Sequence, residues 1–155
     1  MPFSVFISYS TSDLANATVL SGWVTAAGAK PFLAEYSLAP GRALAADIVT
    51  AIQNCDLFLL LWTGSARNSE WVPQEIGIAK GAAKPIMPVV LQRGLDLPGF
   101  IKDLKYLAAY KDPTASVQWL YQHLVAQVKQ KQVGAVVAMG VIGAILLLLA
   151  SRGDS

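Results

Sequence analysis

The sequence has very few of the residues from which metal sites and nucleophilic triads are built. Cys55 and His123 are its only cysteine and histidine. No intrachain disulfide can form, and the usual His/Cys ligand sets for zinc cannot be assembled, so we expect no metal site. His123 lies beside Trp119 in an amphipathic stretch, where a packing or surface role is expected rather than a catalytic one. Cys55 lies in an apolar segment and is expected to be buried and inert.

Charge and glycine motifs are also scarce. Charged residues make up 14% of the chain, the net charge is +2, and no dense basic block occurs, which argues against nucleic-acid binding. The glycines are dispersed and form neither a G-x-G-x-x-G run nor a G-x-x-x-x-G-K-[ST] run, which argues against hydride-transfer and phosphate-loop enzymes. Any catalysis must therefore depend on carboxylates, and no cofactor is expected.

What the chain does have is apolar sequence, since 54% of its 155 residues are hydrophobic. The longest apolar run is VGAVVAMGVIGAILLLLA at 133–150, which carries no charge. As a helix it would cover roughly 27 Å of the ~30 Å hydrocarbon core of a bilayer. A core helix in so small a domain would show a polar stripe, and this run has none. We therefore predict a single membrane-spanning helix.

The flanks of this run predict its orientation. Lys129 and Lys131 precede it and only Arg152 and Asp154 follow, so the larger N-terminal part is expected in the cytoplasm, with a single-pass C-terminal anchor. The N-terminus also lacks the pattern of a signal peptide. Small residues at four-residue spacing in the run would allow two such helices to self-associate. The predicted divisions are a domain at 1–128, a juxtamembrane linker at 129–132, the span at 133–150 and a short tail at 151–155.

The N-terminal part alternates apolar runs with amphipathic stretches. Strands are predicted at 3–9, 30–34, 56–62, 85–91 and 106–110, and helices at 12–27, 42–54, 69–82 and 113–131. Ser12 is the expected N-cap of the first helix and Gly28 its stop, and 95–105 is expected to be a loop with at most one helical turn. This alternation predicts an α/β fold with a parallel sheet and helices on both faces. Ligands bind such sheets at the carboxyl ends of the strands, here the loops 8–13, 35–42 and 63–69.

One carboxylate stands out in the helix predicted at 69–82. Trp71 and Glu75 are four residues apart and share a face, and Glu75 falls within the apolar arc of that helix. An ionised carboxylate without partners in such a place costs several kcal/mol. Glu75 therefore either faces a cleft, as a site residue would, or accepts hydrogen bonds from a neighbouring loop and ties the fold together. Helical periodicity alone does not separate the two.

Three blocks of the sequence resemble the Toll/interleukin-receptor (TIR) domain family. VFISYSTSD at 5–13 resembles the first TIR signature, EYSLAPGR at 35–42 the loop after the second strand, and SEWVPQEIGIA at 69–79 the W-x-x-x-E helix of NAD-cleaving members. The resemblance runs across 3–125 with the blocks in family order and spacing. It implies a flavodoxin-like fold with a five-stranded parallel sheet and helices on both faces. The single transmembrane helix predicted from the apolar run follows this domain.

The resemblance also implies a function. Some TIR domains cleave the nicotinamide–ribose bond of NAD, and their catalytic glutamate falls on Glu75 and the preceding tryptophan on Trp71. NAD is then the substrate, and ADP-ribose or a cyclic or conjugated relative is the product. By their places in the motifs, Tyr9, Ser10, Ser37, Arg42 and Tyr110 are expected to line the substrate pocket. A role in immune or antiviral defence follows by family analogy alone.

Other TIR domains are non-catalytic adaptors that act by assembling with one another. Active members of the family often carry basic residues after the first strand and an aromatic residue after the Gly-basic pair of the second loop. Ser10, Thr11 and Ala43 occupy those places here. The alternative is therefore an adaptor that acts through self-association or contact with other TIR domains at a membrane, and a mimic of host TIR domains is a third possibility.

Overall fold

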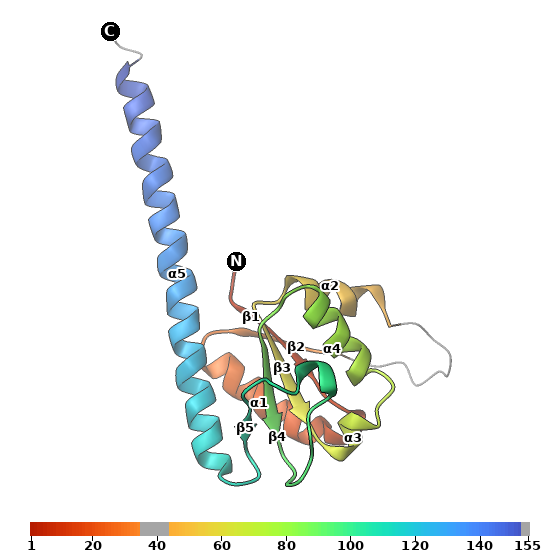
Figure 1. Ribbon diagram of the computed structural model, residues 1–155. Coiled ribbons are helices and arrows are strands. Elements are labelled where there is room, and N and C mark those ends of the chain that lie inside the picture. The colour runs from red at the N-terminus through yellow and green to blue at the C-terminus, as the bar shows by residue number, and fades with distance from the viewer. Residues whose placement is uncertain (35–43, 153–155) are drawn as a thin grey trace.

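The computed structural model describes residues 1–34 and 44–152, with side chains described as far as residue 140. Its centre is a five-stranded sheet with the strand order β2-β1-β3-β4-β5, and every neighbouring pair is parallel (Figure 1). The strands are β1 (Ser4–Ser8), β2 (Lys30–Leu33), β3 (Leu57–Trp62), β4 (Ile86–Val90) and β5 (Leu107–Ala108). The parallel α/β architecture predicted from the alternation of strands and helices is confirmed.

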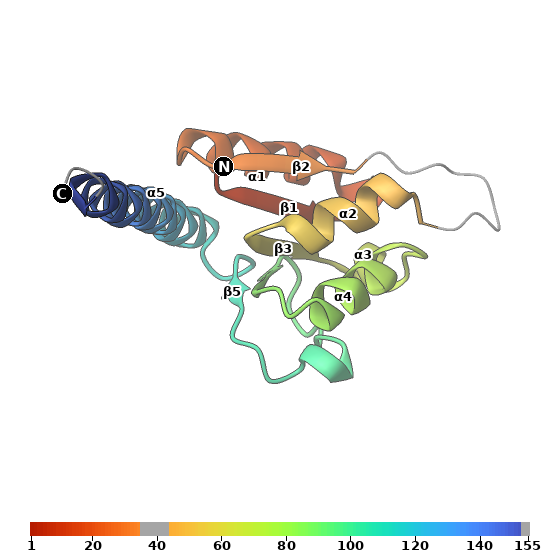
Figure 2. The same ribbon diagram turned by 90° about the horizontal axis from the view of Figure 1, so that it is seen from above.

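Helices cover both faces of the sheet (Figure 2). They are α1 (Leu14–Ala26), α2 (Ala46–Asn54), α3 (Gly64–Arg67), α4 (Val72–Gly81) and α5 (Pro113–Arg152), with 3-10 turns η1 (Thr11–Asp13) and η2 (Gly99–Ile101). Alternate residues of β1 and β3 pack on α1 and α5 on one face and on α2 and α4 on the other. Because β3 is covered on both faces, all six of its residues are buried, as the unbroken apolar run LFLLLW predicts.

Most differences from the predicted elements lie at their ends. Ser12 is not an N-cap, because the 3-10 turn η1 occupies the expected first turn. Neither η1 nor α1 begins with a capping side-chain hydrogen bond. Gly28 does end α1, with a φ of +90°. The single helical turn expected within 95–105 is η2. The four-residue helix α3 was not predicted, because it is too short to show helical periodicity; it is capped by Thr63, whose Oγ1 accepts from the Ala66 N–H at 3.0 Å.

The C-terminal helix is the largest departure. In place of a helix ending at 131 and a separate one starting at 133, α5 runs without interruption from Pro113 to Arg152 and extends past the sheet (Figure 1). The predicted linker at 129–132 is therefore helical. Nothing in that tetrapeptide, KQKQ, breaks a helix, since it contains neither proline nor glycine.

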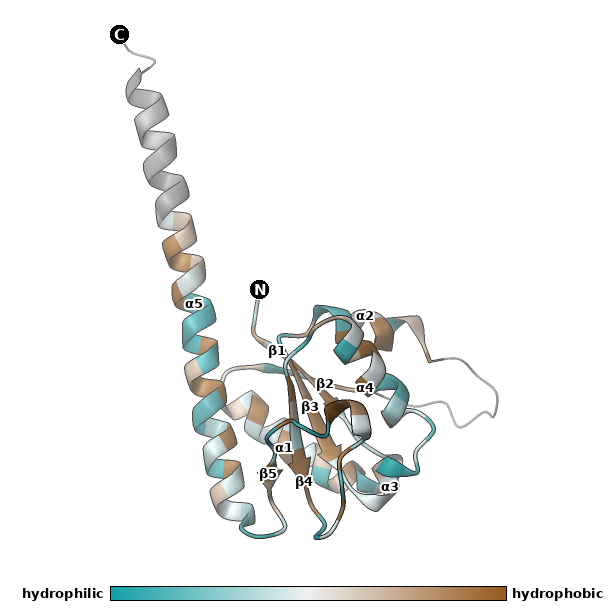
Figure 3. Ribbon diagram, in the orientation of Figure 1, coloured by the Kyte–Doolittle hydropathy of each residue, from teal (hydrophilic) through white to brown (hydrophobic). Residues whose placement is uncertain are grey.

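Figure 3 shows where α5 changes character along its length. Its first part alternates polar and apolar residues and packs on the domain through Leu120, Leu124 and Val128. Beyond Lys131, every side chain from 132 to 140 is exposed. Across the part of the chain whose side chains are described, no helix is long and apolar enough to cross a membrane. Residues 141–150 of the predicted span lie outside that part.

Candidate active site

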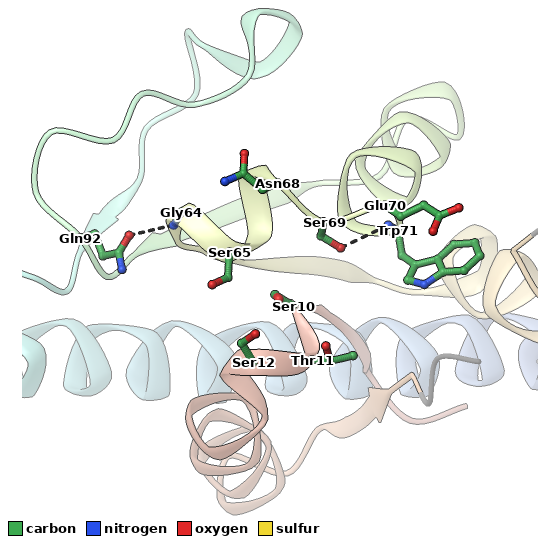
Figure 4. A pocket seen from close by; sticks show the side chains of 10 residues that line it. All are labelled: Ser10, Thr11, Ser12, Gly64, Ser65, Asn68, Ser69, Glu70, Trp71 and Gln92. Carbon is green, nitrogen blue, oxygen red and sulfur yellow. Dashed lines mark hydrogen bonds between the residues drawn. The ribbon is translucent and has the colours of Figure 1, made fainter. Parts of the chain in front are cut away.

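A polar pocket lies at the carboxyl ends of β1 and β3, where parallel α/β sheets bind ligands. Its volume is about 640 Å³. Three segments form it: the turn after β1, the helix α3 with the loop that follows it, and the residues after β4 (Figure 4). Its lining residues are Ser10, Thr11, Ser12, Gly64, Ser65, Asn68, Ser69, Glu70, Trp71 and Gln92.

The lining is rich in neutral hydrogen-bonding groups. Five of its ten residues carry a hydroxyl, two carry an amide, and Glu70 carries the one ionisable side chain. Two contacts within the pocket hold its loops in place (Figure 4): Gln92 Oε1 accepts from the Gly64 N–H at 2.8 Å, and Ser69 Oγ accepts from the Trp71 N–H at 3.2 Å. Such a surface suits a polyhydroxylated ligand, because hydroxyls and amides both donate and accept.

A hydrogen bond between the turn after β1 and the end of β3 joins two walls of the pocket. Thr63 Oγ1 donates to Asp13 Oδ2 at 2.6 Å while accepting from the Ala66 N–H. Hydrogen bonds to a carboxyl group are among the stronger classes of hydrogen bond. It fixes the spacing between η1 and α3, and with it the width of the pocket.

Glu75 lies behind this pocket rather than in its wall. The side chain is fully buried, as are those of Val72, Ile76 and Ala79 on the same helix, which confirms its place on the apolar arc of α4. Ser8, the last residue of β1, is also fully buried, and its Oγ donates to Glu75 Oε1 at 2.7 Å. Donation to a carboxylate favours its charged form and offsets part of the cost of burying it.

Chain connectivity places the Ser8–Glu75 pair next to the pocket. Trp71 lies one helical turn before Glu75, and Ser10 lies two residues after Ser8, and both line the pocket. Glu75 itself has no exposed surface in this conformation. A substrate in the pocket would therefore reach the carboxylate only after a covering group moved.

The other predicted site residues do not all gather here. Ser10 lines the pocket, but the Tyr9 hydroxyl donates to the Ala34 carbonyl at 2.7 Å within the core. Tyr110 is half-buried at the β5 end of the sheet, and the Arg93 guanidinium lies 5.7 Å from its ring centroid. Ser37 and Arg42, with the departure at Ala43, lie outside the described residues.

Sequence reasoning missed several residues that the structure brings to this region. Ser65, Asn68 and Gln92 line the pocket without having been named, although the first two lie within the loop 63–69 that was expected to bind ligand. Ser8 was missed as the partner of Glu75. The available signal was the serine that directly follows the apolar run VFI of β1, because a buried hydroxyl needs a polar partner.

Cys55 and His123 lie away from the pocket, as expected. Cys55 is buried, and burial raises the pKa of its thiol, although the positive charge of Lys84 acts in the opposite direction. A protonated, enclosed thiol is a poor nucleophile. The His123 ring stacks on Trp119 with 4.8 Å between ring centroids.

Comparison with known proteins agrees with this architecture. The family described as TIR domain matches residues 5–125. Among solved structures, the TIR domain of the Toll-related receptor TRR-2 from Hydra magnipapillata superposes with a TM-score of 0.63 at 23% identity, covering 77% of this chain and 96% of that one. A metazoan TIR-STING receptor from C. gigas superposes with a TM-score of 0.55 at 24% identity, covering 73% of this chain and 39% of the receptor. At these identities the structural likeness shows the fold alone.

None of the curated protein sequences compared with this chain matches it. The family match nevertheless spans well over half of the sequence, and it contains the Ser8–Glu75 pair and the whole lining of the pocket. The chain therefore belongs to the TIR domain family.

Proposed function

We propose that this chain is a TIR enzyme that cleaves the nicotinamide–ribose bond of NAD, with Glu75 as the catalytic carboxylate. The observation that carries the proposal is the place of Glu75. A buried carboxylate, hydrogen-bonded to Ser8, lies directly behind a polar pocket at the carboxyl ends of the strands. The TIR family includes many NAD-cleaving members, and their glutamate occupies this position in the W-x-x-x-E motif.

The chemistry requires little more than one well-placed carboxylate. The nicotinamide of NAD is cationic and leaves as a neutral molecule, so no general acid is needed. The ribose develops oxocarbenium character, as in glycoside hydrolysis, and a negative group beside it stabilises that charge. Water capture gives ADP-ribose, capture by another atom of the same molecule gives a cyclic product, and capture by a third molecule gives a conjugate.

The pocket supplies groups that suit this substrate. Ser10, Ser65 and Asn68 offer hydrogen bonds to ribose hydroxyls, and the Trp71 side chain offers an aromatic surface. Because Glu75 is enclosed, the proposal requires that substrate binding or domain assembly open a path between the pocket and the carboxylate. Activity is then expected to depend on local protein concentration.

A non-catalytic adaptor is the second candidate, and the full burial of Glu75 favours it. A glutamate held by Ser8 inside the domain also serves as a tie between β1 and α4, with no chemistry. No lysine or arginine is found in the described lining of the pocket, although NAD carries a pyrophosphate. Such an adaptor would act by assembling TIR domains on a membrane surface.

A membrane anchor at the C-terminus remains part of the proposal, with the TIR domain in the cytoplasm. The residues described at 133–140 are exposed and carry no polar side chain, and the apolar sequence continues to 150. Confinement to a surface would raise the local concentration of the domains. A role in immune or antiviral signalling follows from family analogy alone.

Nicotinamide release from NAD tests the enzyme. The full-length protein, in membranes or detergent and at high local concentration, is compared with Glu75→Gln and Glu75→Ala. Release by the wild type and its loss by at least a hundredfold in both variants is the expected result, since one preorganised electrostatic group is worth about 10²–10³ in rate. Circular dichroism shows whether each variant is folded.

Glu70→Gln is the matched control, because Glu70 is the carboxylate in the pocket wall. If Glu70→Gln abolished release and Glu75→Gln did not, the catalytic assignment would be wrong. If folded and assembled wild-type protein released nothing, the adaptor would take the place of the enzyme. Unfolding of both Glu75 variants would point to the structural tie.

A further inference from the structure

The two ends of the sheet differ in charge. At the end where the strands begin, the described charged residues are Lys30, Lys80, Lys84, Lys102, Lys105, Lys129 and Lys131 against Asp56 and Asp103. At the end where they finish, which holds the pocket, acidic residues prevail. They are Asp13, Asp47, Glu70, Asp96 and Asp112 against Arg67, Arg93 and Lys111. The domain therefore has a basic end and a weakly acidic end.

Two lysines of the basic end line one hollow. Lys30 and Lys131 both line a cavity of about 320 Å³ whose wall also includes Cys55. Lys84 is close enough to Cys55 for its charge to act on the thiol. Of the acids at this end, Asp56 is paired with Lys131 at 2.7 Å, and Asp103 shares the wall of a neighbouring cavity with Lys84. Among the described residues, neither Lys30 nor Lys84 forms an ion pair. We name Lys30, Lys84, Lys129 and Lys131 the basic collar.

The helix α5 leaves the domain at this collar. Among the residues whose side chains are described, Val128 is the last buried residue of α5. Lys131 is the last that bonds to the domain, through Asp56 and the Pro2 carbonyl. The next turns, VGAVVAMG at 133–140, are apolar on every side of the helix and exposed, with Val136 and Met139 at 69% and 73%. A second helix would cover one stripe of such a segment and leave the rest in water. The hydrocarbon of a lipid bilayer would cover all sides of this segment.

Exposed apolar side chains extend the same surface beside Lys84. Phe100 and Leu104 line a neighbouring cavity of about 410 Å³ together with Lys80 and Lys84, and 46% of Phe100 is exposed. The Lys80 ammonium lies over the Phe100 ring, 5.9 Å from its centroid, and donates to the Phe100 carbonyl. Lysines interleaved with exposed apolar residues are typical of surfaces that lie against lipid headgroups.

We propose that the basic collar docks the TIR domain on an anionic lipid surface, with the start of the strands facing the bilayer and the pocket facing away. This docking rests on the proposed membrane anchor but not on NAD cleavage. The uninterrupted helix sets the orientation, because it runs beside the sheet and emerges only at the end where the strands begin (Figure 1). The acidic residues at the pocket end would be repelled by the same surface.

Lysine reactivity in vesicles tests the docking. The full chain is reconstituted in phosphatidylcholine vesicles and in vesicles with roughly a third phosphatidylserine, and acetylation is read peptide by peptide. Each lysine at an anionic surface contributes about fivefold to the docking equilibrium, so Lys30 and Lys84 should react several times more slowly in the anionic vesicles, and high salt should reverse this. Lys111, at the pocket end, should react equally in both.

The paired variant Lys30→Gln/Lys84→Gln should weaken the salt-sensitive protection of Lys80 and Lys105, which lie at the same end of the sheet. The control variant Arg93→Gln/Lys111→Gln, at the pocket end, should leave that protection unchanged.

Each contrary outcome overturns the docking in its own way. Equal reactivity of Lys30 and Lys84 in the two kinds of vesicle would exclude an effect of lipid charge. Protection of Lys111 instead would reverse the orientation, and protection that grew with protein density but not with lipid charge would assign the collar to a second copy of the chain. A chain that floated with neither kind of vesicle would remove the anchor as well. The assay contains no NAD, so loss of the enzyme proposal would leave its result unchanged.

Discussion

Ser8, at the end of β1, is a hydrogen-bond donor to the buried Glu75 carboxylate. Ser8 and Glu75 are both fully buried and are joined by a 2.7 Å hydrogen bond. Removing the donor while keeping the acceptor takes one hydrogen bond from a buried carboxylate, which costs stability. The bond therefore bears on stability whether or not Glu75 is catalytic.

Ser8→Ala is expected to lower the free energy of unfolding by about 1–3 kcal/mol, measured by urea denaturation. In an active enzyme the acid limb of the rate–pH profile should also move to higher pH, because the carboxylate has lost a donor that favours its charged form. Ser65→Ala, an exposed hydroxyl in the pocket, is the control and should change stability by less than about 0.5 kcal/mol. Equal stability of the two variants would mean that the Ser8 hydroxyl contributes nothing.

Among the elements, the end of α1 depends on a single glycine. Gly28 has a φ of +90°, and a Cβ at that position would lie 3.5 Å from a methyl group of Val128 on α5. Gly22, inside α1, has ordinary helical geometry and open space around it. The same substitution should therefore act in opposite directions at the two positions.

Gly28→Ala is expected to destabilise the domain by about 1–2 kcal/mol, because the left-handed backbone conformation is costly for a residue with a Cβ. Gly22→Ala should instead stabilise it by roughly 0.5–1 kcal/mol, the difference in helix propensity. Thermal or urea unfolding of both variants measures the two effects. A stabilising Gly28→Ala would contradict the role given to the turn between α1 and β2.

The ion pair between Lys131 and Asp56 joins α5 to the start of the sheet. Partial burial by itself would raise the pKa of Asp56, but the hydrogen bond from Lys131 and those from Ser4 outweigh burial and lower the pKa below its usual 3.8. A carboxyl group with a lowered folded-state pKa contributes stability above pH 3.8. That contribution is lost as the pH falls through the folded-state value below 3.8.

Asp56→Asn should therefore reduce stability at neutral pH and make the remaining stability less sensitive to acid below pH 3.8. Since both side chains are about a third exposed, at 35% and 28%, the loss should be under about 1 kcal/mol. Urea denaturation at neutral and acidic pH measures it, with the exposed Asp103→Asn as control. A loss that persisted unchanged in strong acid would exclude the ion pair as its cause.

At the scale of the whole molecule, the uninterrupted helix α5 connects the TIR domain rigidly to the C-terminal part of the chain. No flexible linker separates the domain from residues 133–140, since the helix is continuous from Pro113 to Arg152. A domain held on such a helix keeps one orientation relative to it. Two domains brought together by their helices would therefore meet in a defined geometry.

Removal of residues 132–155 should release the protein from membranes. The full chain is expected to remain in the pellet after carbonate extraction, and the shortened chain, which ends just after the contact between Lys131 and Asp56, should stay in solution. If the enzyme proposal holds, nicotinamide release per molecule should also fall in the shortened chain at equal dilution. A shortened chain that still pelleted with membranes would exclude an anchor in that segment.

The sequence by itself was sufficient for the order and type of the main elements. Unbroken apolar runs such as LFLLLW predict strands buried on both faces, and helical periodicity placed Glu75 among buried residues of α4. Both patterns lie within a single element, because the side of a strand or helix that is buried must be apolar wherever that element lies in the fold. The helix α3 was not predicted, and the strand β5 was predicted too long, because elements of only two to four residues show no measurable periodicity.

The tertiary structure alone decided which side chains meet. Ser8 and Glu75 are 67 residues apart in the chain, and no pattern in either segment names the other as its partner. The same holds for Thr63 with Asp13, which sets the width of the pocket. It also holds for the lysines of the basic collar, which come from β2, from the connection between α4 and β4, and from α5. Hydrogen bonds and surface charge depend on distances across the sheet, and the strand order β2-β1-β3-β4-β5 is what brings these residues together.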